Sequence, residues 1–165
     1  MKKASLILFV MLALAASAAA QNKFSETSQC GKAEKDYKIE VGDRPGHVFQ
    51  IIQVKCSFTK GEIEGIQIKE ELATEFSEIR EDAGRGRWLS VLTMANGDKV
   101  YCHGELTLTL KNGVPQIEEG RWNWSGGTGK LKGIKGKGTY KANIAADGSG
   151  TVEGEGEYTM PASKK

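Results

Sequence analysis

The chain has 165 residues, of which 39% are hydrophobic and 27% are charged, a composition typical of a globular protein. It carries 23 Lys and Arg residues against 21 Asp and Glu residues, a formal net charge of +2. Proteins that neutralise nucleic-acid phosphates usually have a large basic excess, so this balance argues against a nucleic-acid partner.

The first 20 residues have the pattern of a secretory signal peptide. Two lysines precede an apolar run over residues 6–16, and three alanines ending at Ala20 supply a small-residue cleavage site. The run is shorter than the roughly 20 residues that a membrane span needs, so we expect cleavage and no membrane span in the mature chain. Removing the two lysines leaves 21 basic against 21 acidic residues. We therefore expect a periplasmic or secreted protein with no net charge.

Three cysteines in an exported chain leave at least one without an internal partner. Cys30 lies in residues 21–35, which we interpret as a flexible leader before a single β domain over residues 36–165. From this leader Cys30 can reach Cys56 or Cys102, and we slightly favour Cys56. The spacing of the cysteines and of the two histidines matches no metal motif. We expect no metal site, no cofactor and no catalytic thiol.

Most of the domain alternates apolar and polar residues with the period of two that is typical of β-strands. Asn96-Gly97, Asn112-Gly113 and Asp147-Gly148 are the clearest turn signals between the alternating segments. Residues 69–82 fit a helix or a strand, and we favour a strand because the meander would otherwise lose a neighbour. The other expected strands are residues 36–41, 47–58, 62–68, 86–94, 99–110, 117–125, 138–144 and 150–160.

Glycine is concentrated in the second half of the chain, where 13 of the 21 glycines follow residue 103. Glycine weakens a strand unless it marks a bend, a bulge or a crowded inner surface. A barrel of tightly coiled strands needs all three. The sequence therefore predicts an all-β fold whose antiparallel sheet closes into a barrel.

Two segments of opposite charge stand out. Residues 62–82 are strongly acidic, and residues 127–141 carry five lysines and no acid. We interpret both as solvated faces rather than as an anion-binding lip. The stretch after Gly127 lacks the glycine and hydroxyl positions of a phosphate loop. We expect Leu131 and Ile134 to fill one end of the barrel while the lysines face water.

The sequence WSGGTGKLKGIKGKGTYK at residues 124–141, with MANGDKVYCHG at residues 94–104, resembles exported bacterial proteins related to the allene oxide cyclase type of β-barrel. The resemblance is strongest from about Gly84 to Tyr158, and this group is similar in form to the lipocalin-like (calycin-like) barrels. It implies an eight-stranded antiparallel barrel, frequently oligomeric, with a hydrophobic lumen open at one end. It implies no agreed activity for the bacterial members, and no catalytic residue can be carried over.

The turns also predict which side chains share a face. Two-residue turns at Asn96-Gly97 and Asn112-Gly113 would place Leu92 opposite Tyr101 and His103 opposite Trp122. In the last hairpin, Tyr140 opposite Gly154 would face inward while Lys141 opposite Glu153 faces outward, and a shift of one residue would mix the faces. The resulting candidates for a ligand-binding lumen are Trp88, Tyr101, His103, Trp122, Trp124, Tyr140 and Tyr158.

Two functions remain open at this point. The aromatic and polar face favours a protein that binds a small, mostly apolar ligand in its lumen. A second apolar face favours a structural or interaction protein whose filled barrel forms homo-oligomers or binds partners on its outside. An isomerase or cyclase activity rests on the family resemblance alone, and we lean against an enzyme.

Overall fold

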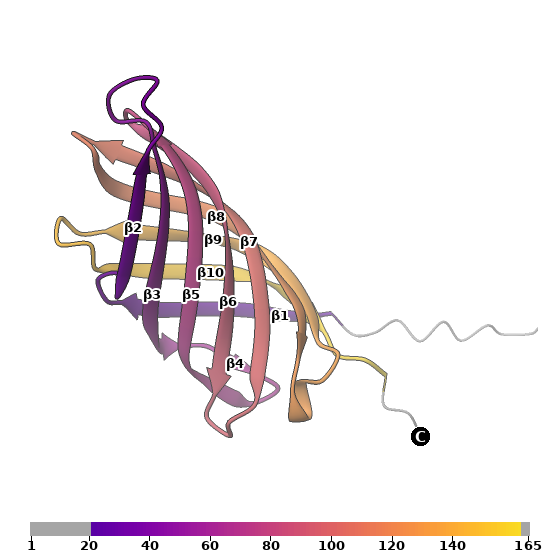
Figure 1. Cartoon of the computed structure of the whole chain (residues 1–165). Coiled ribbons are helices and arrows are strands. Elements are labelled where there is room, and N and C mark those ends of the chain that lie inside the picture. The colour runs from indigo at the N-terminus through magenta and orange to yellow at the C-terminus, as the bar shows by residue number, and fades with distance from the viewer. Residues whose placement is uncertain (1–20, 163–165) are drawn as a thin grey trace, which may run out of the picture.

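The alternating sequence forms a closed sheet in the computed structural model, which describes residues 21–162. Eight antiparallel strands follow each other around the barrel in the order β1, β10, β9, β8, β7, β6, β5 and β3, and β3 pairs with β1 to close it (Figure 1). The elements are β1 (Asn22–Cys30), β2 (Lys35–Glu40), β3 (Val48–Lys60), β4 (Glu62–Ile63), β5 (Ile66–Arg80), β6 (Ala83–Met94), β7 (Lys99–Lys111), β8 (Val114–Gly127), the 3-10 turn η1 (Gly129–Leu131), β9 (Lys135–Ile144) and β10 (Gly150–Thr159). The expected all-β barrel is confirmed, and residues 69–82 lie mostly in a strand. The predicted signal peptide lies outside the described residues.

The expected flexible leader is wrong for most of its length. Asn22–Cys30 is strand β1, which is hydrogen-bonded to β10 on one side and to β3 on the other. It buries Phe24 and Ser28 inside the barrel. The strand expected at residues 36–41 corresponds to β2, which only extends the sheet beside β3 and is exposed along its whole length. Strand β1 is therefore a barrel strand that was not predicted, because its sequence is mostly polar.

A disulfide fixes the end of β1. Cys30 is bonded to Cys56 on β3, the slightly favoured of the two pairings. Cys102 on β7 is a free, buried cysteine.

One end of the barrel is filled by apolar side chains, which we call the plug. Ile63 on β4, Leu131 in η1 and Ile134 are all 0% exposed, which confirms the expected burial of the last two. The continuous strand expected at residues 62–68 is wrong, because Glu64 and Gly65 adopt left-handed φ angles of 52° and 73° and turn the chain back on itself.

The predicted register of the last hairpin is confirmed. Tyr140 lies opposite Gly154 and Lys141 opposite Glu153. The Lys141 ammonium, however, pairs with Glu119 on β8 at 2.8 Å. Side-chain size and charge thus determined this register, although one ion pair forms with the other neighbouring strand.

The two Asn-Gly hairpins depart from the expected register. At Asn96-Gly97 the turn has three residues: the Met94 N–H donates to the Asp98 carbonyl, and Gly97 has a φ of 85°. The next turn has two residues as expected, but an irregularity between Thr109 and Leu110 shifts the β7–β8 pairing by one residue. His103 therefore lies opposite Asn123 instead of Trp122.

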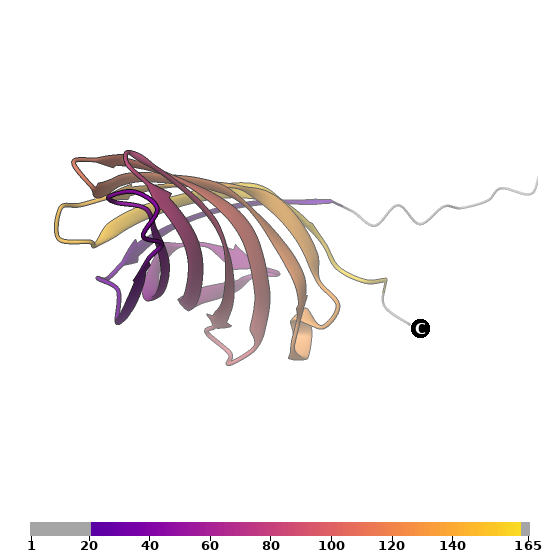
Figure 2. The same ribbon diagram turned by 45° about the horizontal axis from the view of Figure 1, so that its top comes forward.

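The strands are strongly curved. Figure 2 shows β5, β6 and β7 bending around the barrel. The two ends of the described chain lie on the same side, because Asn22 pairs with Tyr158. No helix among residues 21–162 has the length and apolar character to cross a membrane.

Candidate functional site

The barrel encloses a cavity of about 540 Å³. Its lining includes three connections at the end opposite the plug: residues 31–33, 113–115 and 145–150. The lumen is therefore closed at one end by the plug and lined at the other by loops. Cavities of roughly 300–1,000 Å³ are typical of small-molecule sites.

Aromatic rings form one wall of this cavity. Trp122 and Trp124 stack with ring centroids 4.9 Å apart, and Phe24 meets Trp124 edge to face at 4.8 Å. Inward-facing glycines on neighbouring strands leave room for the rings: a Cβ atom at Gly104 would lie 2.7 Å from the Trp88 ring. The glycines that are frequent in the second half of the chain thus allow the aromatic rings to pack closely against the backbone.

The structure separates the predicted lumen residues into three groups. Tyr158 is buried, but its hydroxyl donates at 3.1 Å to a carboxylate oxygen of Glu64, which follows the plug residue Ile63 in the chain, and it does not line the cavity. The prediction that Tyr101 and His103 line the lumen is wrong. The shifted registers point both side chains out of the barrel, where they are exposed. The candidates that do line the cavity are Trp88, Trp122, Trp124 and Tyr140.

Four glutamates share the lumen with these rings. Glu26 comes from β1, Glu71 and Glu75 from β5, and Glu118 from β8. The Ser90 hydroxyl donates to Glu71 and the Tyr140 hydroxyl donates to Glu118, each at 2.5 Å. No Lys, Arg or His side chain faces inward from the eight barrel strands of the described chain. The lumen therefore holds acidic groups of one kind without a basic partner.

Burial keeps these carboxyl groups protonated to higher pH than usual. It raises the pKa of Glu26 from 4.5 to about 8, with a further contribution from the charge of Glu71. It also raises the pKa of Glu118 to about 7 and those of Glu71 and Glu75 above their ordinary value. The Glu71 charge contributes to the raised pKa of all three other glutamates, so the four groups lie close enough to influence one another.

The Cys102 thiol lies in the same environment. Burial raises its pKa well above the ordinary value, and the charge of Glu71 adds to the effect. A thiol held in its neutral form is a poor nucleophile, so Cys102 lacks the character of a catalytic cysteine.

Sequence reasoning missed the glutamates on β5. The acidic segment was interpreted as a solvated face, yet Glu71 and Glu75 point inward while Leu72 and Phe76 are 42% and 37% exposed on the outside. An irregularity between Ile68 and Glu70 sets this orientation. The available signal was the period of two, which places both glutamates on one face with Ala73 and Ile79. An inverted apolar pattern of this kind is expected at functional sites rather than at purely structural ones.

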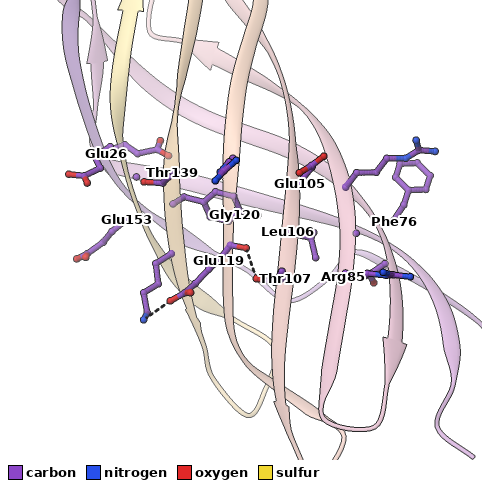
Figure 3. A pocket seen from close by; sticks show the side chains of 18 of the residues that line it. Glu26, Phe76, Arg85, Glu105, Leu106, Thr107, Glu119, Gly120, Thr139 and Glu153 are labelled. Atoms are coloured by element: carbon purple, nitrogen blue, oxygen red, sulfur yellow. Dashed lines mark hydrogen bonds and ion pairs between the residues drawn. The ribbon is translucent and has the colours of Figure 1, made fainter.

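A second, more open hollow is lined mainly by outward-facing side chains of the barrel, and Glu26 and Tyr140 also border it. Figure 3 shows Glu105, Thr107 and Glu119 among the side chains that line it, and the Thr107 hydroxyl donates to the Glu119 carbonyl. Charges alternate across its strands, where Glu105 lies between Arg87 and Arg121. Because these exposed charges compensate one another, we assign the candidate site to the lumen.

No group of three His, Cys, Asp or Glu side chains in residues 21–162 is placed to hold a metal ion. The four lumen glutamates are thus spread around the cavity and do not converge on one point.

The geometry defines a class of fold: a closed eight-stranded antiparallel barrel with a lumen of ligand size. No family model and no curated protein match the sequence. Two of the solved structures that are similar to the chain are pterocarpan synthase dirigent proteins. PsPTS1 shares 13% identity over 85% of this chain and 95% of its own, with a TM-score of 0.50; GePTS1 shares 11% over 88% and 89%, with a TM-score of 0.52. Likeness at this identity shows the fold alone, a dirigent-like barrel related to the one predicted.

Proposed function

We propose that this protein binds a small, mostly apolar molecule in the lumen of its barrel. The observation that carries the proposal is the cavity of about 540 Å³, which has an aromatic wall and four inward glutamates as its main polar groups. Sites of this composition fix a ligand through apolar contact and orient it through the polar groups.

The chain's own tryptophans test the proposal. All three line the cavity, so energy transfer from tryptophan to a bound probe reports on the lumen. Titration with the neutral apolar dye N-phenylnaphthylamine is expected to give a saturable signal with one site per chain. A linear response without saturation would contradict lumen binding.

A matched pair of variants locates the dye. Ala73 lines the cavity, whereas Ala83 is exposed at the start of β6. Ala73→Leu reduces the free volume and is expected to weaken binding, and Ala83→Leu is expected to leave it unchanged. Equal binding by both variants would place the dye outside the lumen.

A second candidate function is interaction through the outer face. Tyr37 on β2, Ile51 on β3 and Phe76 on β5 lie opposite one another, and all three side chains are exposed. Leu89 on β6 is 59% exposed. Exposed apolar side chains grouped in this way are typical of surfaces that meet another protein. Homo-oligomers through this face are compatible with ligand binding, and light scattering of the wild type and of Leu89→Glu tests for them.

We further propose that the chain is an exported relative of the allene oxide cyclase type of barrel. The basic start, the apolar run and the small-residue site before Gln21 support a secreted or periplasmic location. Mass spectrometry of the exported protein is expected to find a chain beginning near Gln21, and an intact N-terminus would contradict export with cleavage. An isomerase or cyclase activity is the weaker alternative, supported only by the resemblance and by the pterocarpan synthases that share the fold.

A further inference from the structure

We propose that the preferred ligand of the lumen is an organic cation, a protonated amine attached to a small aromatic or apolar body. This inference rests on the proposed lumen binding and names the class of molecule that the lumen selects. It follows from the four inward glutamates, the absence of inward basic side chains among the described strands and an unpartnered indole N–H in the same cavity.

The charge of the lumen is the first argument. Glu26, Glu71, Glu75 and Glu118 face one cavity, and no Lys, Arg or His faces inward from the barrel strands within residues 21–162. These groups become negatively charged when they lose their protons, and a low-dielectric cavity whose charges have one sign then favours ligands of the opposite sign. Lys32 and Lys38 border the cavity but are exposed at its loop end.

Hydrogen bonding distinguishes the four carboxyl groups. Glu71 and Glu118 accept hydrogen bonds from Ser90 and Tyr140. The carboxyl groups of Glu26 and Glu75 have no hydrogen-bond partner among the described residues, and their pKa values are raised by burial and by neighbouring charge. These two carboxyl groups are therefore available to a ligand, and an ammonium group can donate to them.

The second, independent observation is Trp88. Its side chain is 8% exposed and lines the cavity, and its Nε1–H has no hydrogen-bond acceptor within residues 21–162. A buried donor without a partner costs free energy, so a ligand that offers an acceptor there gains affinity. The face of an aromatic ring or an oxygen next to the amine supplies that acceptor. Glu75 lies opposite Trp88 across β5 and β6, and both residues line the cavity.

The spread of the glutamates favours an organic cation over a metal ion. No three acidic groups of the described chain converge on one point, as metal coordination requires. An alkylammonium needs fewer contacts, and the stacked Trp122 and Trp124 rings provide the apolar and cation–π surface for its body.

Binding of such a cation is coupled to the release of a proton from a lumen carboxyl group. Near neutral pH Glu26, whose pKa is about 8, retains its proton, so entry of an ammonium group is balanced by release of that proton to solvent. The titratable groups that line the cavity are Glu26, Glu71, Glu75, Glu118, Tyr140 and Cys102 and, as exposed residues, Lys32, Asp36, Lys38 and Asp147. Amine affinity is therefore expected to rise from pH 5 to pH 8, and the affinity for a neutral analogue is expected to stay level.

Three probes of similar shape and different charge test the proposal by calorimetry on the disulfide-bonded protein. They are phenethylamine, phenethyl alcohol and phenylacetate. The amine is expected to bind about tenfold more tightly than the alcohol at pH 8, and phenylacetate is expected to bind more weakly than either. Equal affinity for the amine and the alcohol would overturn the proposal, and this comparison needs no variant.

Variants then assign the selectivity to the lumen. Glu75→Gln keeps the shape of the side chain but removes its charge, and it is expected to lower amine affinity about tenfold without changing alcohol affinity. Glu105→Gln on the exposed outer face is the control and is expected to change neither. If Glu75→Gln fails to fold, Glu26→Gln serves in its place. Amine selectivity that survives both substitutions would refute the proposal.

The outcomes separate this inference from the proposed function. If N-phenylnaphthylamine binds in the lumen but the amine has no advantage over the alcohol, lumen binding stands and selection of cations is wrong. If neither the dye nor any of the three probes binds, both proposals fail.

Discussion

Raising the pH from 5 to 8 is expected to destabilise the fold, and Glu26 is the group that allows the effect to be isolated. Its pKa is about 8 in the folded protein, chiefly because of burial, against an ordinary value of 4.5. Between these values the folded state holds a proton that the unfolded state has released. The free energy of unfolding therefore falls as the pH rises through this window.

The magnitude follows from the same two values. One pKa unit corresponds to about 1.4 kcal/mol, which gives a loss of about 3 kcal/mol between pH 5 and pH 8 from Glu26 alone. The raised pKa of Glu118, about 7, acts in the same direction. Hydrogen bonding to His47 lowers the pKa of Glu78 to about 2. The effect of Glu78 on the free energy of unfolding therefore changes with pH below this window. A loss of this size is large beside a typical total stability of about 5–15 kcal/mol.

Urea unfolding at a series of pH values measures the effect with the disulfide intact. Glu26→Gln cannot ionise, so its stability is expected to exceed that of the wild type at pH 8 and to fall less between pH 5 and pH 8. Glu153→Gln on the exposed face of neighbouring β10 is the matched control and is expected to follow the wild type. Parallel pH profiles for wild type and Glu26→Gln would refute burial of this carboxyl group in the lumen.

Three further predictions concern the frame around the cavity. Leu131→Ala is expected to cost about 2–5 kcal/mol in urea unfolding, because its side chain is fully buried in the plug; a cost below about 1 kcal/mol would contradict the plug. Reducing the Cys30–Cys56 bond, which joins residues 26 positions apart, is expected to cost about 3 kcal/mol, and unchanged stability after reduction would argue against the bond. Thiol titration of the oxidised protein is expected to find one thiol, Cys102, that reacts only after unfolding, and immediate reaction would contradict its burial.

Much of the barrel could be predicted because its local signals agree. In the last hairpin, Tyr140 needs the space beside Gly154, and Lys141 opposite Glu153 needs the outer face, so only one register satisfies size and charge together. The plug was predictable for a similar reason, since Leu131 and Ile134 are the apolar residues of an otherwise basic and glycine-rich loop.

The other strand registers could not be predicted, because they depend on single-residue irregularities in the pairing. A three-residue turn at Asn96-Gly97 and a shift beside Thr109 each moved the pairing by one residue, which placed Tyr101 and His103 outside. An asparagine–glycine pair fits both turn lengths, so the sequence does not distinguish between them. Strand β1 was missed because it carries few apolar residues, and its pairing with β10 and β3 is a long-range property.

The lumen glutamates could not be predicted from hydrophobicity, because β5 turns carboxyl groups inward and Leu72 and Phe76 outward. This arrangement is unfavourable for stability taken alone, since buried carboxyl groups must stay protonated or find a partner. A ligand that occupies the lumen supplies a physical reason for it.

The tryptophan indole N–H signals in a nitrogen–proton correlation spectrum test the central claim most directly. Trp88, Trp122 and Trp124 are the only tryptophans of the chain, and all three line the cavity. During titration with phenethyl alcohol or N-phenylnaphthylamine their indole signals are expected to shift, with Trp88 shifting most because its N–H gains a partner. Indole signals that stay in place while backbone amides around Tyr37 and Leu89 shift would contradict lumen binding and favour an outer interaction surface.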